Sequence, residues 1–144
     1  MQTIDITETI ELPPEKVFAL LADHANYDRF PGITASELLN EGEPAPNGLG
    51  ALRRISLGDL VLDEEITGYE PSKRLAYRIV ASKPFSVVHD GGEIELTETP
   101  EGTEVRWRST FKLRIPLIGW FVTRRAAKAF DRGFRAVLQS LPDL

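Results

Sequence analysis

The sequence predicts an α+β domain in which a curved, seven-stranded antiparallel sheet wraps around a long C-terminal helix, with two short helices after the first strand. Two observations support this prediction. One strand-like segment precedes the short helices, and six more follow them with turn residues between. Beyond residue 117 the spacing of apolar residues becomes that of a single amphipathic helix. The apolar face of this helix must be buried, and the sheet is the large surface available to bury it.

The composition is that of a globular protein with one core. Of the 144 residues, 42% are hydrophobic and 27% are charged, and a chain of this length buries about two thirds of its unfolded surface. We therefore expect a single domain over residues 1–144. Cysteine is absent, which excludes disulfides, thiolate nucleophiles and iron–sulfur clusters.

No segment has the pattern of a signal peptide or of a membrane span. The first twenty residues carry early acidic groups and lack a basic start followed by an apolar run. The longest strongly apolar stretch, residues 115–122, contains Pro116 and is far shorter than the ~20 residues that cross a bilayer. We expect a cytoplasmic protein without an integral membrane segment.

The first strand and the two short helices follow from the residues at their boundaries. Residues 3–12 alternate apolar and polar side chains, and Pro13 ends that strand. Pro14 begins a helix, because a proline in the first turn lacks an N–H that would have no partner there. Asp23 is expected to cap the second helix, which the sequence Pro31-Gly32 ends. The apolar stripe of the first helix consists of Val17, Phe18, Leu20 and Leu21.

Turn chemistry divides the middle of the chain into short strands. Glycine, proline, asparagine or aspartate occurs at each break, as is typical of antiparallel hairpins. Consecutive strands with short connections indicate an antiparallel meander. The six predicted strands are residues 33–39, 51–57, 60–69, 74–81, 87–97 and 103–115.

The C-terminal segment predicts a long amphipathic helix with a basic outer side. Its apolar stripe at helical spacing is Phe130, Phe134, Val137, Leu138 and Leu141. Residues 114–141 contain six basic residues and one acidic residue, although the net charge of the chain is -5. Either this is a solvated helix face, or it makes a peripheral contact with anionic lipid or a carboxylate. An acidic protein without a broad basic face is a poor candidate for binding nucleic acid.

The order of these elements resembles the START-related helix-grip fold, which polyketide cyclase/dehydrase-like proteins and the birch-pollen-allergen family share. Three local motifs strengthen the resemblance: PEKVF at 14–18, YEPSKRLAY at 69–77 and GTEVRW at 102–107. The resemblance implies a cavity between sheet and helix for a lipid, polyketide or other hydrophobic molecule. It implies no single reaction, because members of one fold serve as carriers or as enzymes.

Strand parity places several polar residues on the predicted inner face. Leu62 and Ile66 mark the apolar side of their strand, and Glu64 shares that side. Arg53 on the neighbouring strand is then a candidate ion-pair partner, because an isolated buried charge is costly. The residues alone leave open whether Glu64 is paired inside or solvated at an exposed strand end.

Aromatic side chains are the main candidates for the walls of the cavity. Parity places Tyr77 and Trp107 inward, and both combine large apolar area with one polar group. The same residues also fit ordinary core packing. The predicted aromatic lining is Phe30, Tyr77, Trp107, Phe111 and Phe130.

The face occupied by His89 is open from the sequence. Parity from Ile94 puts His89 outside and Asp90 inside, whereas a bulge at Gly91-Gly92 reverses the assignment. The resemblance to the plant-like branch of the family favours an inward His89. If His89 and Glu64 meet there, they form a candidate acid–base pair, since histidine titrates near neutral pH.

Three functions are compatible with these patterns. The first is a carrier or binding protein for a hydrophobic small molecule, with Arg53, Glu64 and His89 orienting it beside the aromatic lining. The second is a cyclase or dehydratase that uses His89 and Glu64. The third is a module that docks a partner or membrane through the basic helix.

No metal-ligand spacing, phosphate loop or nucleophile elbow occurs, so we expect no metal and no cofactor. We expect a monomer or a weak dimer.

Overall fold

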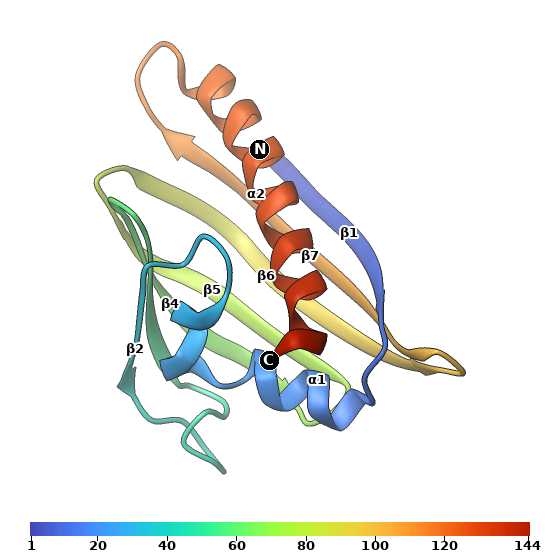
Figure 1. Ribbon diagram of the computed structural model, residues 1–144. Helices are drawn as coiled ribbons and strands as arrows, with labels where there is room; N and C mark the ends of the chain where they lie inside the picture. Colours follow the sequence, from blue (N-terminus) through green and yellow to red (C-terminus); the bar gives the residue numbers. More distant parts are fainter.

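A computed structural model describes residues 1–144 and has the predicted α+β helix-grip architecture (Figure 1). The helices are α1 (Pro14–Leu21), the 3₁₀ segment η1 (His24–Arg29), α2 (Gly119–Ser140) and the short 3₁₀ turn η2 (Leu141–Asp143). The strands are β1 (Gln2–Ile10), β2 (Ala35–Asn40), β3 (Leu52–Leu57), β4 (Leu60–Glu70), β5 (Arg74–Lys83), β6 (Ser86–Thr99) and β7 (Gly102–Arg114).

The sheet contains seven antiparallel strands in the order β1-β7-β6-β5-β4-β3-β2, which confirms the predicted meander. β1 and β2 are consecutive strands in the chain but lie at opposite edges of the sheet. The connection between them contains α1 and η1, so these short helices cross one end of the sheet (Figure 1).

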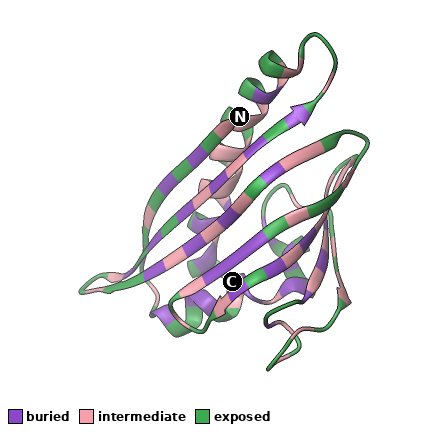
Figure 2. Cartoon of the chain, turned by 180° about the vertical axis from the view of Figure 1, so that it is seen from behind, coloured by how far each residue is buried: buried purple, intermediate pink, exposed green.

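The core lies between the sheet and the helices. Buried and exposed residues alternate along the strands, as expected when one face is covered (Figure 2). In β1, for example, Ile4 and Ile6 are buried while Asp5 between them is exposed. One cluster of 23 buried residues extends from β1 to Leu141 in η2. The inner face of the sheet is therefore the surface that any internal site must use.

The long helix α2 covers only part of that inner face. It packs on β1 and β7, and Figure 1 shows it running along these two strands. Phe134 stacks on Trp107 of β7, and Phe130 meets Phe111 edge to face. η1 packs on β2 and β3 at the other side of the sheet. The two covers leave the middle of the inner face between them.

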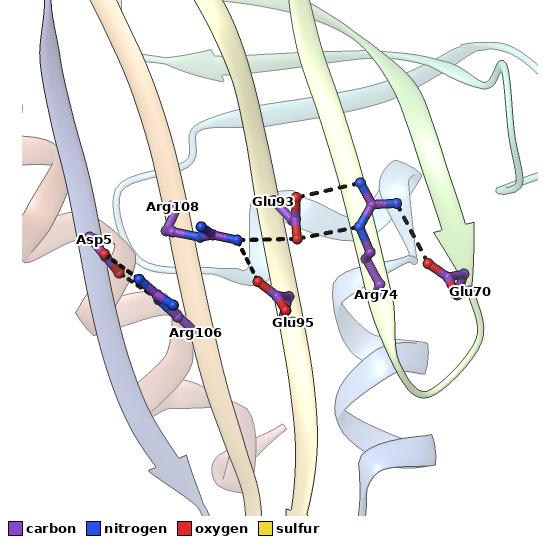
Figure 3. Close-up of polar contacts among 7 residues, drawn as sticks. All are labelled: Asp5, Glu70, Arg74, Glu93, Glu95, Arg106 and Arg108. Atoms are coloured by element: carbon purple, nitrogen blue, oxygen red, sulfur yellow. Dashed lines mark hydrogen bonds and ion pairs between the residues drawn. The ribbon is translucent and has the colours of Figure 1, made fainter.

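The outer face of the sheet is bound together by ion pairs rather than by apolar contacts (Figure 3). Arg106 pairs with Asp5 across β7 and β1, and Arg108 reaches both Glu93 and Glu95 on β6. Arg74 continues the row to Glu93 and to the end of β4. Arg74, Arg106 and Arg108 are thus neutralised by neighbouring carboxylates.

Several local expectations need correction. The carboxylate of Asp23 does not cap η1; it accepts hydrogen bonds from the side chains of Asn26 and Arg29 instead. Leu20 is only half-buried, because α1 is a single short helix at the edge of the core. α2 begins at Gly119, close to the expected start near residue 117, and Leu117 just before it has a left-handed backbone with φ of 69°. No helix of the protein combines the length and the apolar character needed to cross a bilayer.

Candidate ligand-binding site

A cavity of about 300 Å³ lies between the inner face of the sheet and α2. Hydrophobic residues make up 17 of the 24 that line it, so its surface is predominantly apolar. The lining comes from β1, from β3 to β7, from η1 with the loop that follows, and from the C-terminal half of α2. This volume is at the lower end of the range found for small-molecule sites.

Aromatic rings form the side of the cavity beneath α2. The rings of Trp107 and Phe134 are nearly parallel, with centroids 4.0 Å apart. The ring centroid of Phe130 lies 5.5 Å from that of Phe111 and 6.3 Å from that of Phe134. The inward direction of Trp107 and Phe111 follows from strand parity, and helical spacing brings Phe130 and Phe134 above them. A ligand in the cavity would therefore meet ring faces and edges.

The polar side of the cavity centres on Arg53 and Glu64. The two residues are directly opposite each other in the antiparallel register of β3 and β4, and both are buried. Nε of Arg53 donates a hydrogen bond to Oε1 of Glu64 at 2.9 Å, and Nη2 lies 2.8 Å from the same oxygen. Both contacts use Oε1, so no protein donor bonds Oε2 of Glu64.

Three further groups surround the guanidinium of Arg53. Its Cζ lies 4.5 Å from the ring centroid of Tyr27 and 5.2 Å from that of Tyr77, within the range of cation–π attraction. Nη1 donates to Nδ1 of His24 at 3.1 Å. The buried charge is thus compensated by a carboxylate, an imidazole and two aromatic rings.

His24 is a neutral link between Arg53 and the loop before β3. Because Nδ1 accepts a hydrogen bond from Arg53, the ring proton is on Nε2, which donates to the backbone oxygen of Asn47 at 2.9 Å. Burial, together with the charge of Arg53, lowers the pKa of His24 to about 3. His24 therefore stays uncharged at neutral pH.

Tyr77 connects the aromatic side of the cavity to the polar side. Its hydroxyl oxygen accepts a hydrogen bond from Nε1 of Trp107 at 3.0 Å. Its ring stacks on that of His89, with centroids 5.6 Å apart. Gly92 on β6 makes this position available, because a Cβ there would overlap Cζ of Tyr77. Burial raises the pKa of the Tyr77 hydroxyl, which keeps the phenol protonated.

His89 points inward because β6 has a bulge. The register with β7 shifts between His89 and Gly91, and Gly91 has φ of 120°. This is the bulged arrangement, in which Asp90 faces outward and is exposed. The open choice in the sequence is thereby resolved in favour of an inward His89, which lines the cavity.

The hydrogen bonds of His89 determine its tautomer. Nδ1 accepts from the backbone N–H of Ile79 at 3.0 Å, so Nε2 carries the proton and donates to Oγ of Ser109 at 2.9 Å. Burial is the main reason that the pKa of His89 falls to about 4. Both ring nitrogens have protein partners, and the ring is neutral at physiological pH.

All of the predicted lining residues except Phe30 face the cavity. Phe30 is buried, but its ring packs edge to face on Tyr27 at 4.8 Å, and Tyr27 occupies the position next to the cavity. The predicted acid–base pair is not assembled by direct contact: the hydrogen-bond partners of His89 are Ile79 and Ser109, and that of Glu64 is Arg53.

The sequence reading missed the contributions of Tyr27, His24 and Ser109. Tyr27 and His24 are on η1, where a short irregular helix gives no periodic signal for the side that faces inward. Ser109 has the same parity as Trp107, so strand alternation is the signal for its position on the inner face. Its pairing with His89 depends on the bulge, which the sequence left open.

Comparison with known proteins agrees with this geometry. A family model described as polyketide cyclase/dehydrase and lipid transport matches residues 1–144. The chain belongs to this family. Uncharacterized proteins of Mycobacterium tuberculosis and Mycobacterium bovis are 28% identical to it over 111 residues, which is 76% of this chain. The match spans 65% of the length of those relatives, which are longer proteins.

Solved structures of low sequence identity share the fold of this chain. A START superfamily protein from Mycobacterium smegmatis matches with a TM-score of 0.79 at 12% identity, over 98% of this chain and 97% of the other. The Zhui aromatase/cyclase from Streptomyces sp. R1128 matches with a TM-score of 0.76 at 18% identity, over 97% and 90%. The family and the fold are those of a ligand-binding domain.

Proposed function

We propose that this protein binds a hydrophobic small molecule with one polar end and acts as its carrier. The observation behind the proposal is the cavity itself, which is predominantly apolar and has its charged groups gathered around Arg53. An apolar guest gains free energy from leaving water, while the polar groups fix its orientation. Lipids and polyketides have this chemical character.

The polar end of the ligand is expected beside Glu64. Oε2 of this carboxylate has no donor from the protein, although Oε1 is fully engaged with Arg53. A ligand hydroxyl or N–H would satisfy Oε2 without displacing an existing contact. This arrangement favours ligands that carry a hydrogen-bond donor over ligands that carry only a carboxylate.

A cyclase or dehydratase that uses His89 and Glu64 is the second candidate. Its support is that both residues line one cavity and that the chain has the fold of an aromatase/cyclase. Proton transfer needs a free lone pair or an acidic proton near the substrate. The lone pair of His89 on Nδ1 faces Ile79, so this residue is better suited to donate one fixed hydrogen bond. Binding without chemistry is therefore the better supported proposal.

A cavity-filling substitution tests the proposal without disturbing the core. A Cβ on Gly133 of α2 would have no atom within 4 Å, and Gly133 lines the cavity. Gly133→Leu should fill the space and lower the affinity for the apolar fluorophore N-phenyl-1-naphthylamine at least tenfold. Helix stability should be retained or improved, since leucine is a better helix former than glycine. Fluorescence titration measures the affinity and thermal unfolding measures the stability.

Arg132→Leu is the matched control, because it adds a leucine to the exposed side of the same helix. Its affinity for the fluorophore should equal that of the wild type. Native mass spectrometry of freshly purified protein should also show an apolar molecule bound to the wild type and absent from Gly133→Leu. Equal fluorophore binding by both variants and the wild type would refute a binding role for the cavity.

A further inference from the structure

Four large apolar side chains stand in solvent where β7 joins α2. Leu117 is 96% exposed and Trp120 is 69% exposed. Ile118 and Phe121 are also exposed, and the rings of Trp120 and Phe121 meet edge to face. We call Leu117, Ile118, Trp120 and Phe121 the apolar tip. A contiguous exposed group of this kind marks an interaction surface more often than isolated exposed residues do.

The backbone of the apolar tip is strained at its most exposed residue. Leu117 has φ of 69°, in the left-handed region where glycine is favoured. The N–H of Ile118 donates to the oxygen of Pro116 at 2.8 Å, which together with this φ gives the strained form of a γ-turn. A leucine at this position has both an unfavourable backbone and an exposed apolar side chain. Strain of this kind is concentrated at functional sites in proteins.

Five cations surround the apolar tip and are not neutralised by the protein. None of them forms an ion pair, in contrast to Arg74, Arg106 and Arg108 in the middle of the outer face of the sheet (Figure 3). All five are exposed, and residues 112–130 contain no acidic side chain. We call these residues the basic collar: Lys112, Arg114, Arg124, Arg125 and Lys128.

The tip is held in a fixed position relative to the sheet. Oγ1 of Thr123 accepts a hydrogen bond from the backbone N–H of Leu113 at 2.9 Å and donates to the oxygen of Gly119 at 2.6 Å. Thr123 is buried, so these bonds tie the first turn of α2 to the end of β7. Arg125 in turn lies over the ring of Phe121, 5.9 Å from its centroid. A preorganised surface loses little conformational entropy on binding.

We propose that the apolar tip and the basic collar bind the surface of an anionic lipid bilayer. The tip would enter the interface between headgroups and acyl chains, where tryptophan and aliphatic side chains are favourable. Helical rise places Arg124, Arg125 and Lys128 about 6 to 12 Å behind Trp120 along α2. At that depth their charges meet the phosphate and carboxylate groups of anionic lipids.

The shape and charge of this surface favour a bilayer over a protein partner. Leu117 projects into solvent almost completely, so a protein partner would need a matching pocket, whereas a bilayer needs no complementary shape. A second copy of this chain would place one basic collar against another, and like charges at an interface are repulsive. The collar adds five unpaired positive charges beside the tip, which matches an anionic lipid surface.

This inference goes beyond the proposed cavity function and does not depend on it. No residue of the apolar tip lines the cavity, although α2 carries both Trp120 outside and Phe130 inside. Membrane binding by the tip can therefore be tested with the cavity intact. If both proposals hold, an apolar ligand would be exchanged at the bilayer surface by the same helix that covers it.

Vesicle flotation tests the proposal with two kinds of liposome, phosphatidylcholine alone and phosphatidylcholine with about 30% phosphatidylserine. The wild type should float with the anionic vesicles, and high salt should release it. Arg124→Glu combined with Arg125→Glu should reduce binding tenfold or more. Leu117→Gly should also reduce binding while leaving the fold unharmed, because glycine adopts a left-handed backbone without strain.

Two matched controls use residues away from the tip. Lys73→Glu reverses an exposed charge in the turn between β4 and β5, and Val80→Ser removes an exposed apolar side chain from β5. Neither should change vesicle binding. Brominated lipids should quench the fluorescence of the wild type and have far less effect on Trp120→Phe, since the buried Trp107 stays out of the bilayer.

Several outcomes would overturn the proposal. Absence of flotation with anionic vesicles would refute it, as would binding that the tip and collar variants leave unchanged. Concentration-dependent dimerisation that buries Trp120 without vesicles would assign the surface to a second copy. Gly133→Leu should float like the wild type, so failure of the cavity proposal and failure of the membrane proposal give different results.

Discussion

Arg53 and Glu64 face each other across β3 and β4 as a buried ion pair, with Nε and Oε1 2.9 Å apart. The pair is at the cavity wall, and Arg53 also contacts His24 and two tyrosine rings. A buried pair of this type contributes little net stability, because removing both charges from water offsets most of their attraction. Removing only one of the two charges, by contrast, leaves the other buried without its partner and is strongly destabilising.

Arg53→Met should destabilise the fold strongly. The substitution leaves the carboxylate of Glu64 buried without its only donor, and breaking a buried pair typically costs about 3–5 kcal/mol. The double variant Arg53→Met/Glu64→Leu should recover most of that loss, since neither charge remains. Urea unfolding of the wild type, both single variants and the double variant measures the coupling energy.

Arg54→Met is the control for this cycle, because Arg54 pairs with Asp63 at the more exposed outer face of the same strands. This substitution should lower the free energy of unfolding by less than about 1 kcal/mol. A loss of similar size for Arg53→Met and Arg54→Met would contradict the view that burial makes the inner pair critical.

Gly92→Ala should destabilise the protein through the ring of Tyr77. The new Cβ would overlap that ring, and the ring is confined by the His89 stack and by Arg53. Overpacking of this kind costs about 1–3 kcal/mol. Tyr77→Leu in the same chain should relieve part of the cost, whereas Gly133→Ala, with free space at Cβ, should be neutral or stabilising. Thermal unfolding compares the stability of the variants. If the losses of stability from Gly92→Ala and Tyr77→Leu are additive in the double variant, a clash between the new Cβ and the Tyr77 ring is ruled out.

The two buried histidines should make the protein less stable in mild acid. Their pKa values in the folded state are about 3 for His24 and about 4 for His89, below the ordinary value near 6.5. Between those limits the unfolded chain binds protons that the folded chain does not, so stability falls as pH falls from about 6.5. Urea midpoints at pH 7 and pH 5.5 measure the effect before most carboxylates titrate.

His24→Gln/His89→Gln is the control, since glutamine can still donate and accept hydrogen bonds but does not titrate. The double variant should be less stable than the wild type at pH 7, with a smaller change between pH 7 and pH 5.5. An equal change in both proteins would mean that other groups cause the acid sensitivity.

Much of the fold could be predicted because its signals are local. Alternation in β1, the prolines at the start of α1 and the apolar stripe of α2 each identify an element without knowledge of its neighbours. Strand parity then placed Arg53 and Glu64 on the inner face, where the cross-strand register pairs them. These inferences need only the two-residue period of a strand.

The parts that could not be predicted depend on irregular backbone and on contacts between distant elements. A single-residue bulge decides that His89 faces inward, and the sequence Gly91-Gly92 only signals that a bulge is allowed there. The approach of His24 to Arg53 is set by how η1 packs on β3, which periodicity does not describe. The exposure of Trp120 likewise depends on where α2 begins.

Trp107 should report the entry of a ligand into the cavity. It is 4% exposed, lines the cavity, and donates its Nε1–H to Tyr77, so a guest beside its ring would change its emission. Trp120→Phe leaves Trp107 as the only tryptophan and should keep a saturable fluorescence response to long-chain alcohols and polycyclic phenols, which carry a hydrogen-bond donor for Glu64. Trp107→Phe should remove that response while Trp120 still emits. Gly133→Leu combined with Trp120→Phe should weaken the response by filling the same space. A response that persists in Trp107→Phe and disappears in Trp120→Phe would instead locate binding at the surface tip and contradict an internal site.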